Sequence, residues 1–130
     1  MKNDRIILDQ TQLELTIQRI CYQLIENHND FLDSVIIVLQ PRGVIFANRI
    51  HNELTKITGN STIPLGKLDA TFFRDDFRRR ESPLIANKTE IDFIIENKKV
   101  ILIDDVLYTG RTIRAGLDAM LAYGRPDLVE

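Results

Sequence analysis

Residues 100–112, Val100-Ile101-Leu102-Ile103-Asp104-Asp105-Val106-Leu107-Tyr108-Thr109-Gly110-Arg111-Thr112, decide the fold class. The four leading apolar residues predict a short strand covered on both faces, as in a parallel sheet. Two carboxylates follow at its carboxyl end, which is where open α/β sheets bind ligands. The Thr-Gly-Arg-Thr turn then opens a helix, whose N–H groups and hydroxyls suit a phosphate. Because carboxylates suit sugar hydroxyls or a metal ion, the stretch predicts a site for a phosphorylated sugar.

Helical and strand-like patterns alternate along the rest of the chain. Apolar residues at helical spacing predict helices, and short apolar runs predict buried strands. The predicted helices cover residues 11–27, 44–56 and 112–122, the predicted strands cover 35–39, 65–73 and 99–103, and a further strand begins at 128. A capping-box spacing at Thr11–Glu14 predicts the start of the first helix. Residues 74–90 are polar and without periodicity, which predicts a long loop.

Composition bounds the class of protein. The chain has 130 residues, enough for one domain with a sizeable core, and 44% of them are apolar and 28% charged. No apolar run is long enough to span a membrane, and Met1–Arg5 lacks the apolar region of a signal peptide. Cys21 is the sole cysteine, which excludes an internal disulfide, and we expect it to be a buried small hydrophobe. We therefore expect a cytoplasmic protein that does not bind membranes.

The stretch 100–112 resembles the phosphoribosyl-pyrophosphate (PRPP) motif of the type I phosphoribosyltransferases. Its Val106–Thr112 part is most similar to the bifunctional pyrimidine operon regulators that are also uracil phosphoribosyltransferases. The resemblance covers nearly the whole chain, with matches in the family's order at 6–9, 41–43, 68–76 and 115–119. It implies an α/β type I phosphoribosyltransferase core, a parallel sheet flanked by helices. An ordinary strand-turn-helix unit with two solvated aspartates would not explain the phosphate-type turn that follows them.

The resemblance assigns roles to the motif. Asp104 and Asp105 would bind the ribose hydroxyls and support an oxocarbenium-like transition state, and one of the two would contact Mg²⁺. The PRPP ribose and 5′-phosphate would be bound by the whole run Asp104, Asp105, Val106, Leu107, Tyr108, Thr109, Gly110, Arg111 and Thr112. Within it, the last four residues would cradle the phosphate. Two interpretations of Tyr108 stay open: it covers the ligand, or it packs as an ordinary aromatic side chain.

A second loop would bind pyrophosphate. Pro41, Arg42 and Gly43 follow the predicted strand 35–39, so they fall at the same sheet edge as Asp104. Arg42 offers a fork of donors for phosphate oxygens, although a solvated strand-to-helix turn is the plain alternative. The sequence leaves the Gln40-Pro41 bond open as cis or trans. Arg74, in the matched stretch 73–76, is the further pyrophosphate candidate, and Arg78–Arg80 would either close over the ligand or lie in solvent.

The function implied by the resemblance is transfer of phosphoribosyl from PRPP to uracil, giving UMP and pyrophosphate, with Mg²⁺. One alternative is a regulator that binds leader RNA of pyrimidine genes, and another is a purine phosphoribosyltransferase. Residues 1–30 carry three basic and five acidic side chains, so we expect RNA binding to be disfavoured. A homo-oligomer is implied. In the resembled family the chain continues past the strand begun at 128, so we expect a single domain lacking its C-terminal part, with weak or absent turnover.

Overall fold

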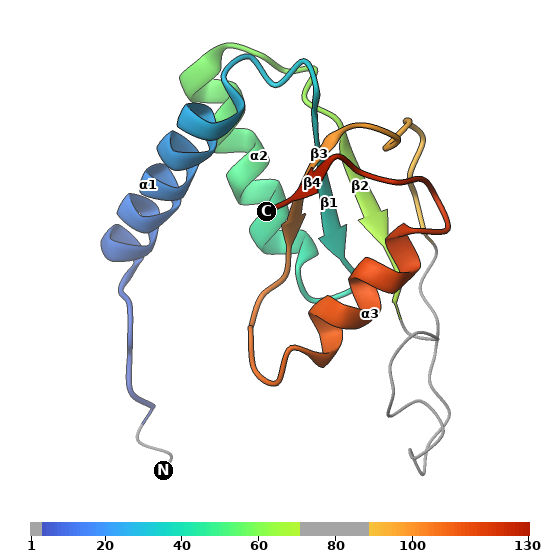
Figure 1. The fold of residues 1–130 in the computed structure, drawn as a ribbon. Helices are drawn as coiled ribbons and strands as arrows, with labels where there is room; N and C mark the ends of the chain where they lie inside the picture. The colour runs from blue at the N-terminus through green and yellow to red at the C-terminus, as the bar shows by residue number, and fades with distance from the viewer. Residues whose placement is uncertain (1–3, 71–88) are drawn as a thin grey trace, which may run out of the picture.

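The computed structural model describes residues 4–70 and 89–130. Its elements in chain order are α1 (Gln10–His28), β1 (Ser34–Leu39), α2 (Val44–Thr58), β2 (Leu65–Leu68), β3 (Lys99–Ile103), α3 (Arg111–Met120) and β4 (Leu128–Val129). The strands form a four-stranded sheet in the order β2-β1-β3-β4, and all of the pairings are parallel. Helices α1 and α2 lie on one side of this sheet and α3 lies on the other (Figure 1). The predicted parallel sheet flanked by helices is confirmed.

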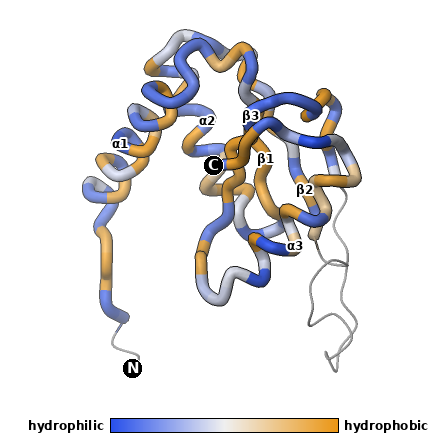
Figure 2. The backbone as a smooth tube through the Cα atoms, in the orientation of Figure 1, coloured by the Kyte–Doolittle hydropathy of each residue, from blue (hydrophilic) through white to orange (hydrophobic). Residues whose placement is uncertain are grey.

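The two central strands explain why the sheet is covered on both faces. Every residue of β1 is buried, and its tube is hydrophobic along most of its length in Figure 2. Ile36 and Val38 pack with α1 and α2, whereas Val35, Ile37 and Leu39 pack with α3. Strand β3 pairs with β1 from Ser34↔Lys99 to Val38↔Ile103. Alternate residues of a strand point to opposite faces, so one apolar run supplies two cores.

The N-cap of helix α1 lies two residues before its predicted position at Thr11. Asp9 accepts a hydrogen bond from the N–H of Gln12 at 2.8 Å, and the Gln12 side chain accepts one from the N–H of Asp9 at 3.0 Å. The capping box therefore runs from Asp9 to Gln12, and the prediction of Thr11 and Glu14 was wrong. A carboxylate two residues upstream offers the same acceptor as a threonine hydroxyl. The buried face of α1 is as predicted, with Ile17, Cys21 and Leu24 inside.

Several other element ends differ from expectation, and α2 runs to Thr58 rather than ending at residue 56. Helix α3 stops at Met120, because Ala122 and Tyr123 donate to carbonyls three residues earlier, which tightens the last turn. Strand β2 ends at Leu68 rather than continuing to residue 73; Asp69 and Ala70 are not in the strand, and residues 71–73 lie outside the described residues. The end of the predicted loop is anchored, since Glu90 and Lys67 exchange two backbone hydrogen bonds of 2.8 and 2.9 Å. The rest of that loop up to residue 88 lies outside the described residues.

A buried histidine joins α1 to the far edge of the sheet. His28 Nδ1 lies 2.7 Å from Ser34 Oγ, and its Nε2 lies 2.7 Å from a carboxylate oxygen of Glu130. Asn27 donates a further hydrogen bond to Glu130. Because Glu130 follows β4, this bridge connects the end of α1 with the start of β1 and the end of β4. None of the helices in residues 4–70 and 89–130 is long and apolar enough to cross a membrane.

Candidate phosphoribosyl site at the carboxyl ends of β1 and β3

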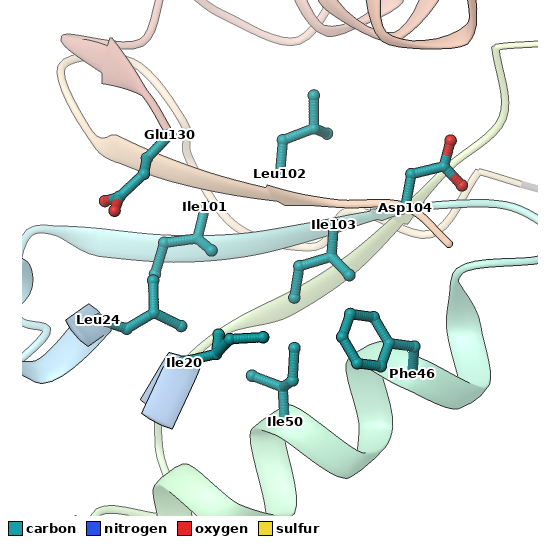
Figure 3. A pocket seen from close by; sticks show the side chains of 9 residues that line it. All are labelled: Ile20, Leu24, Phe46, Ile50, Ile101, Leu102, Ile103, Asp104 and Glu130. Carbon is teal, nitrogen blue, oxygen red and sulfur yellow. The ribbon is translucent and has the colours of Figure 1, made fainter. Parts of the chain in front are cut away.

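The predicted carboxylates follow β3 directly. Asp104 is half-buried and Asp105 is exposed. The Asp105 N–H donates to Asp104 Oδ1 at 2.8 Å, which fixes the first carboxylate against the backbone. In Figure 3 the Asp104 carboxylate points to the same side of β3 as Leu102, away from Ile103 and the helices below it. Since Leu102 packs with the α3 cluster, Asp104 projects towards the α3 side of the sheet.

Opposing influences set the ionisation of Asp104. Partial burial raises the pKa of this carboxyl above its ordinary value, and the neighbouring Asp105 carboxyl adds to the rise. The hydrogen bond from the Asp105 N–H and the positive charge of Arg42 lower the pKa. Burial is the largest of these influences. A cation close to the pair would favour the charged form, so the carboxylates suit a site that also receives a metal ion.

The second predicted loop lies against the end of β3. Gly43 is buried, and a Cβ built on it would lie 3.1 Å from the carbonyl oxygen of Ile103 and 3.0 Å from that of Leu39. The loop backbone therefore approaches the residue just before Asp104 more closely than a side chain would permit. Arg42 is exposed, and its charge is close enough to affect Asp104. The peptide bond between Gln40 and Pro41 is cis.

The phosphate turn leads into α3 as predicted. Gly110 has a left-handed conformation, with φ 85°, and is the residue before the helix. Thr109 Oγ1 accepts a hydrogen bond of 3.3 Å from the N–H of Arg111. The first N–H groups of a helix lack acceptors within the helix, and the helix dipole there favours an anion. Residues 109–112 thus present donors of the kind that bind phosphate.

The three residues between carboxylates and phosphate turn are apolar or aromatic and exposed. The exposed fractions of Val106, Leu107 and Tyr108 are 64%, 78% and 90%. Tyr108 therefore does not pack into the core, which is contrary to the reading of it as an ordinary packing aromatic. Arg74, the last predicted site residue, lies outside the described residues, as do Arg78–Arg80.

An apolar cavity of about 220 Å³ adjoins the site on the opposite face of β3 (Figure 3). Its lining is Ile20, Leu24, Phe46, Ile50, Ile101, Leu102, Ile103, Asp104 and Glu130. Of the lining residues, Asp104 and Glu130 have polar side chains, and the Asp104 carboxylate points to the other face of β3. A phosphorylated sugar requires many hydrogen bonds, so this apolar cavity does not suit such a ligand.

Sequence reasoning missed one feature that shapes this edge. Gly116 is buried within α3 and faces Leu39 of β1. A glycine inside a helix lowers its stability relative to alanine, so its presence is a signal of close packing. The bridging role of His28 was also missed, because a lone histidine on a polar segment carries no distinctive pattern.

Comparisons with known proteins agree with this geometry. The family model described as "Phosphoribosyl transferase domain" matches residues 5–126. The "Bifunctional protein PyrR" of Caldicellulosiruptor bescii is 39% identical over the whole chain, which covers 71% of that relative. The protein of the same name from Actinobacillus succinogenes is 44% identical, with 98% of this chain and 72% of the relative covered.

Solved structures show the same fold at much lower identity. A hypoxanthine-guanine phosphoribosyltransferase from Bacillus anthracis superposes with a TM-score of 0.72 at 15% identity, over all of this chain and 72% of the other. The enzyme from Leishmania tarentolae, in complex with GMP, gives a TM-score of 0.66 at 15% identity, over 97% of this chain and 66% of that one. These structures show the shared fold, and the match to the family model together with the two relatives establishes that the chain belongs to the phosphoribosyltransferase family.

Proposed function

We propose that this chain binds PRPP where β1 and β3 end and transfers its phosphoribosyl group to uracil. In the reaction a ring nitrogen of uracil forms a bond to C1 of the ribose and gives up its proton. The bond from C1 to the pyrophosphate oxygen breaks, and pyrophosphate leaves with the electron pair. The products are UMP and pyrophosphate.

The observation that carries the proposal is the meeting of a cationic loop and a carboxylate pair at one sheet edge. Gly43 abuts the Ile103 carbonyl, so Arg42 and Asp104 come from loops in contact. A departing pyrophosphate accumulates negative charge, which Arg42 would stabilise. The ribose accumulates positive charge, which Asp104 and Asp105 would stabilise. The negative charge on pyrophosphate and the positive charge on the ribose would thus each face an opposite charge, carried by the loops after the neighbouring strands β1 and β3.

The residues of the α3 turn fit the remaining group of PRPP. Thr109, Gly110, Arg111 and Thr112 would hold the 5′-phosphate at the helix N-terminus. Val106 to Tyr108 would lie along the ribose. Anchoring the molecule at the end remote from C1 orients the reacting carbon between Arg42 and the carboxylates, and such positioning can supply much of a rate enhancement.

The carboxylate pair also fits Mg²⁺. Among the described residues no three His, Cys, Asp or Glu side chains gather to hold a metal ion by themselves. Mg²⁺ is commonly held by one or two carboxylates together with substrate phosphates. Asp104 or Asp105 would therefore hold it jointly with PRPP, and when bound it would neutralise charge on the pyrophosphate.

Uracil is proposed as the acceptor base because residues 106–112 are most similar to the motif of the bifunctional regulators that are also uracil phosphoribosyltransferases. The runner-up is a purine base, and the fold alone is shared with hypoxanthine-guanine phosphoribosyltransferases. The chain spans about 71% of the length of the relatives it matches. Binding of PRPP and turnover are therefore measured separately.

The test combines calorimetric titration of PRPP with an assay of nucleotide formation from a panel of nucleobases. PRPP and Mg²⁺ are titrated into the parent, Arg42→Gln and a matched control, Arg49→Gln, which removes an exposed arginine of α2. Loss of the Arg42 charge should weaken PRPP binding about tenfold or more, while the control binds as the parent does. The double variant Asp104→Asn/Asp105→Asn should lose the dependence of PRPP binding on Mg²⁺. No binding by the parent would refute the proposal; IMP or GMP formation in place of UMP would favour the purine alternative.

A further inference from the structure

We propose that Gly116 is a positioning residue for the phosphoribosyl site, because its lack of a side chain lets α3 lie close enough to β1 to hold the phosphate turn beside the Arg42 loop. This inference rests on the proposed function. It concerns a residue that touches no part of the substrate and acts through the placement of a helix.

The close contact is between Gly116 and Leu39. A Cβ built on Gly116 would lie 2.9 Å from Leu39 Cδ2 and 3.2 Å from Leu39 Cδ1. Leu39 is the last residue of β1, and the Pro41–Gly43 loop follows it after one residue. Gly116 lies in the helix that follows the phosphate turn. The contact therefore joins the element behind the 5′-phosphate site to the element behind the pyrophosphate site.

Leu39 has little freedom to move aside. Its exposed fraction is 2%, and it belongs to the buried cluster with Leu68, Val100 and Ala119. Packed interiors accept an added methyl group only by shifting side chains or backbone. An alanine at position 116 would thus push α3 away from β1.

The conformation of Gly116 does not itself require glycine. Among the described glycines, those with positive φ are Gly59, Gly110 and Gly124, and Gly116 lies in regular helix. In such a position alanine ordinarily favours the helix more than glycine does. Position 116 is therefore a glycine because α3 packs closely against the sheet. This close packing sets where residues 109–112 lie.

A rigid helix would transmit the displacement to the phosphate turn. Residues 109–112 precede Gly116 by about one to two helical turns, roughly 6–10 Å along the axis at 1.5 Å per residue. Pyrophosphate would be held by the other loop. A shift of α3 should therefore weaken ligands that carry the 5′-phosphate more than it weakens pyrophosphate.

The test compares three ligands on three proteins by calorimetry in the presence of Mg²⁺. The ligands are PRPP, ribose 5-phosphate and pyrophosphate, and the proteins are the parent, Gly116→Ala and the matched control Gly66→Ala. Gly66 is an equally tight glycine in β2, where a Cβ would lie 2.8 Å from Phe93 Cζ. In Gly116→Ala we expect PRPP and ribose 5-phosphate to bind about fivefold more weakly, because hydrogen bonds to the phosphate weaken when their donors are displaced. Pyrophosphate binding should change less than about twofold, and Gly66→Ala should not change the ratio between ligands.

A second-site variant provides the rescue. Leu39→Val removes the Cδ atoms nearest to the added methyl group, so Leu39→Val/Gly116→Ala should bind ribose 5-phosphate within about twofold of Leu39→Val alone. This pair also covers the case in which Gly116→Ala does not fold. Unchanged ligand ratios in Gly116→Ala, the same change in Gly66→Ala, or no rescue would overturn the positioning role alone. Absence of binding to the parent would overturn the proposed function and this inference with it.

Discussion

Replacing Gly43 by alanine should destabilise the protein through a steric collision with backbone. A Cβ at this position would lie 2.7 Å from Val38 Cγ2, 3.0 Å from the Leu39 carbonyl oxygen and 3.1 Å from the Ile103 carbonyl oxygen. Two of these three atoms belong to strand backbone, which cannot rotate away as a side chain can. The φ of Gly43 is −74° with ψ −14°, a conformation open to any residue, so the cost is one of contact and not of conformation.

The magnitude follows from overpacking. An added methyl group in a packed interior costs about 1–3 kcal/mol. For a domain of this size each kcal/mol lowers Tm by roughly 3–5 °C, so we expect a fall of roughly 3–15 °C. Because the collision lies between the Arg42 loop and the residue before Asp104, pyrophosphate binding should weaken in the same variant.

The assay is thermal unfolding followed by circular dichroism, with pyrophosphate titration at a temperature where the variant is folded. Gly59→Ala is the comparison variant. Gly59 has φ 72° and no heavy atom within 4 Å of a built Cβ, so alanine there meets conformational strain without collision. It should cost about 1–2 kcal/mol and leave pyrophosphate binding unchanged. A Tm of Gly43→Ala within about 2 °C of the parent would refute the reasoning, because even the smallest overpacking cost exceeds that shift.

Three other predictions concern ionisation, the histidine bridge and RNA. Asp104→Asn should raise Tm at pH 7, because burial raises the pKa of Asp104 and so makes its charged form costly in the folded state; the gain should shrink as pH falls through the folded pKa, because the parent's carboxyl is then protonated as well. His28→Ala should cost about 2–4 kcal/mol, since it opens a cavity and strips a partner from buried Ser34, whereas Glu130→Gln should cost about 0–1 kcal/mol. RNA should bind only non-specifically, with Kd of about 10⁻⁴ to 10⁻⁶ M at physiological salt.

Each of these three predictions has a measurement that checks it and a result that would contradict it. Thermal melts of Asp104→Asn and the parent between pH 3 and 8, roughly spanning the ordinary range of carboxyl titration, check the first; a constant Tm difference across that range would contradict it. Urea unfolding compares the two bridge variants, and an equal loss in both would show that Glu130, whose side chain is 39% exposed, matters as much as the buried ring. A salt titration with a pyrimidine-operon leader hairpin and a scrambled hairpin checks the third, which clear preference for the leader would overturn.

The fold was largely predictable because its strands are continuous apolar runs. Lys99–Ile103 was placed with its observed limits, and Val35–Leu39 within one residue, since residues buried on both faces leave no polar interruption. The shared edge of Asp104 and Arg42 followed from parallel strands, whose carboxyl ends meet on the same side.

What could not be predicted depends on contacts distant in sequence. The residues around Gly116 give no sign that Leu39 will face it, and the capping-box spacing at Thr11 and Glu14 did not reveal that Asp9 caps the helix. The end of α3 depended on how the chain turns towards β4. The roles of the site residues remain predictions, because they concern a ligand rather than the fold.

The pairing of β1 with β3 has a consequence for how the protein is made. These neighbours in the sheet are separated in sequence by α2, β2 and the whole of residues 69–98. During synthesis, β1 therefore emerges with one edge that has no partner until residue 103 has left the ribosome. Sheets whose neighbouring strands are far apart in sequence fold slowly, and they expose apolar strand edges until the partner strand has paired. Strand β1 is apolar throughout apart from Ser34, so nascent chains should depend on chaperones most strongly between the emergence of β1 and that of β3.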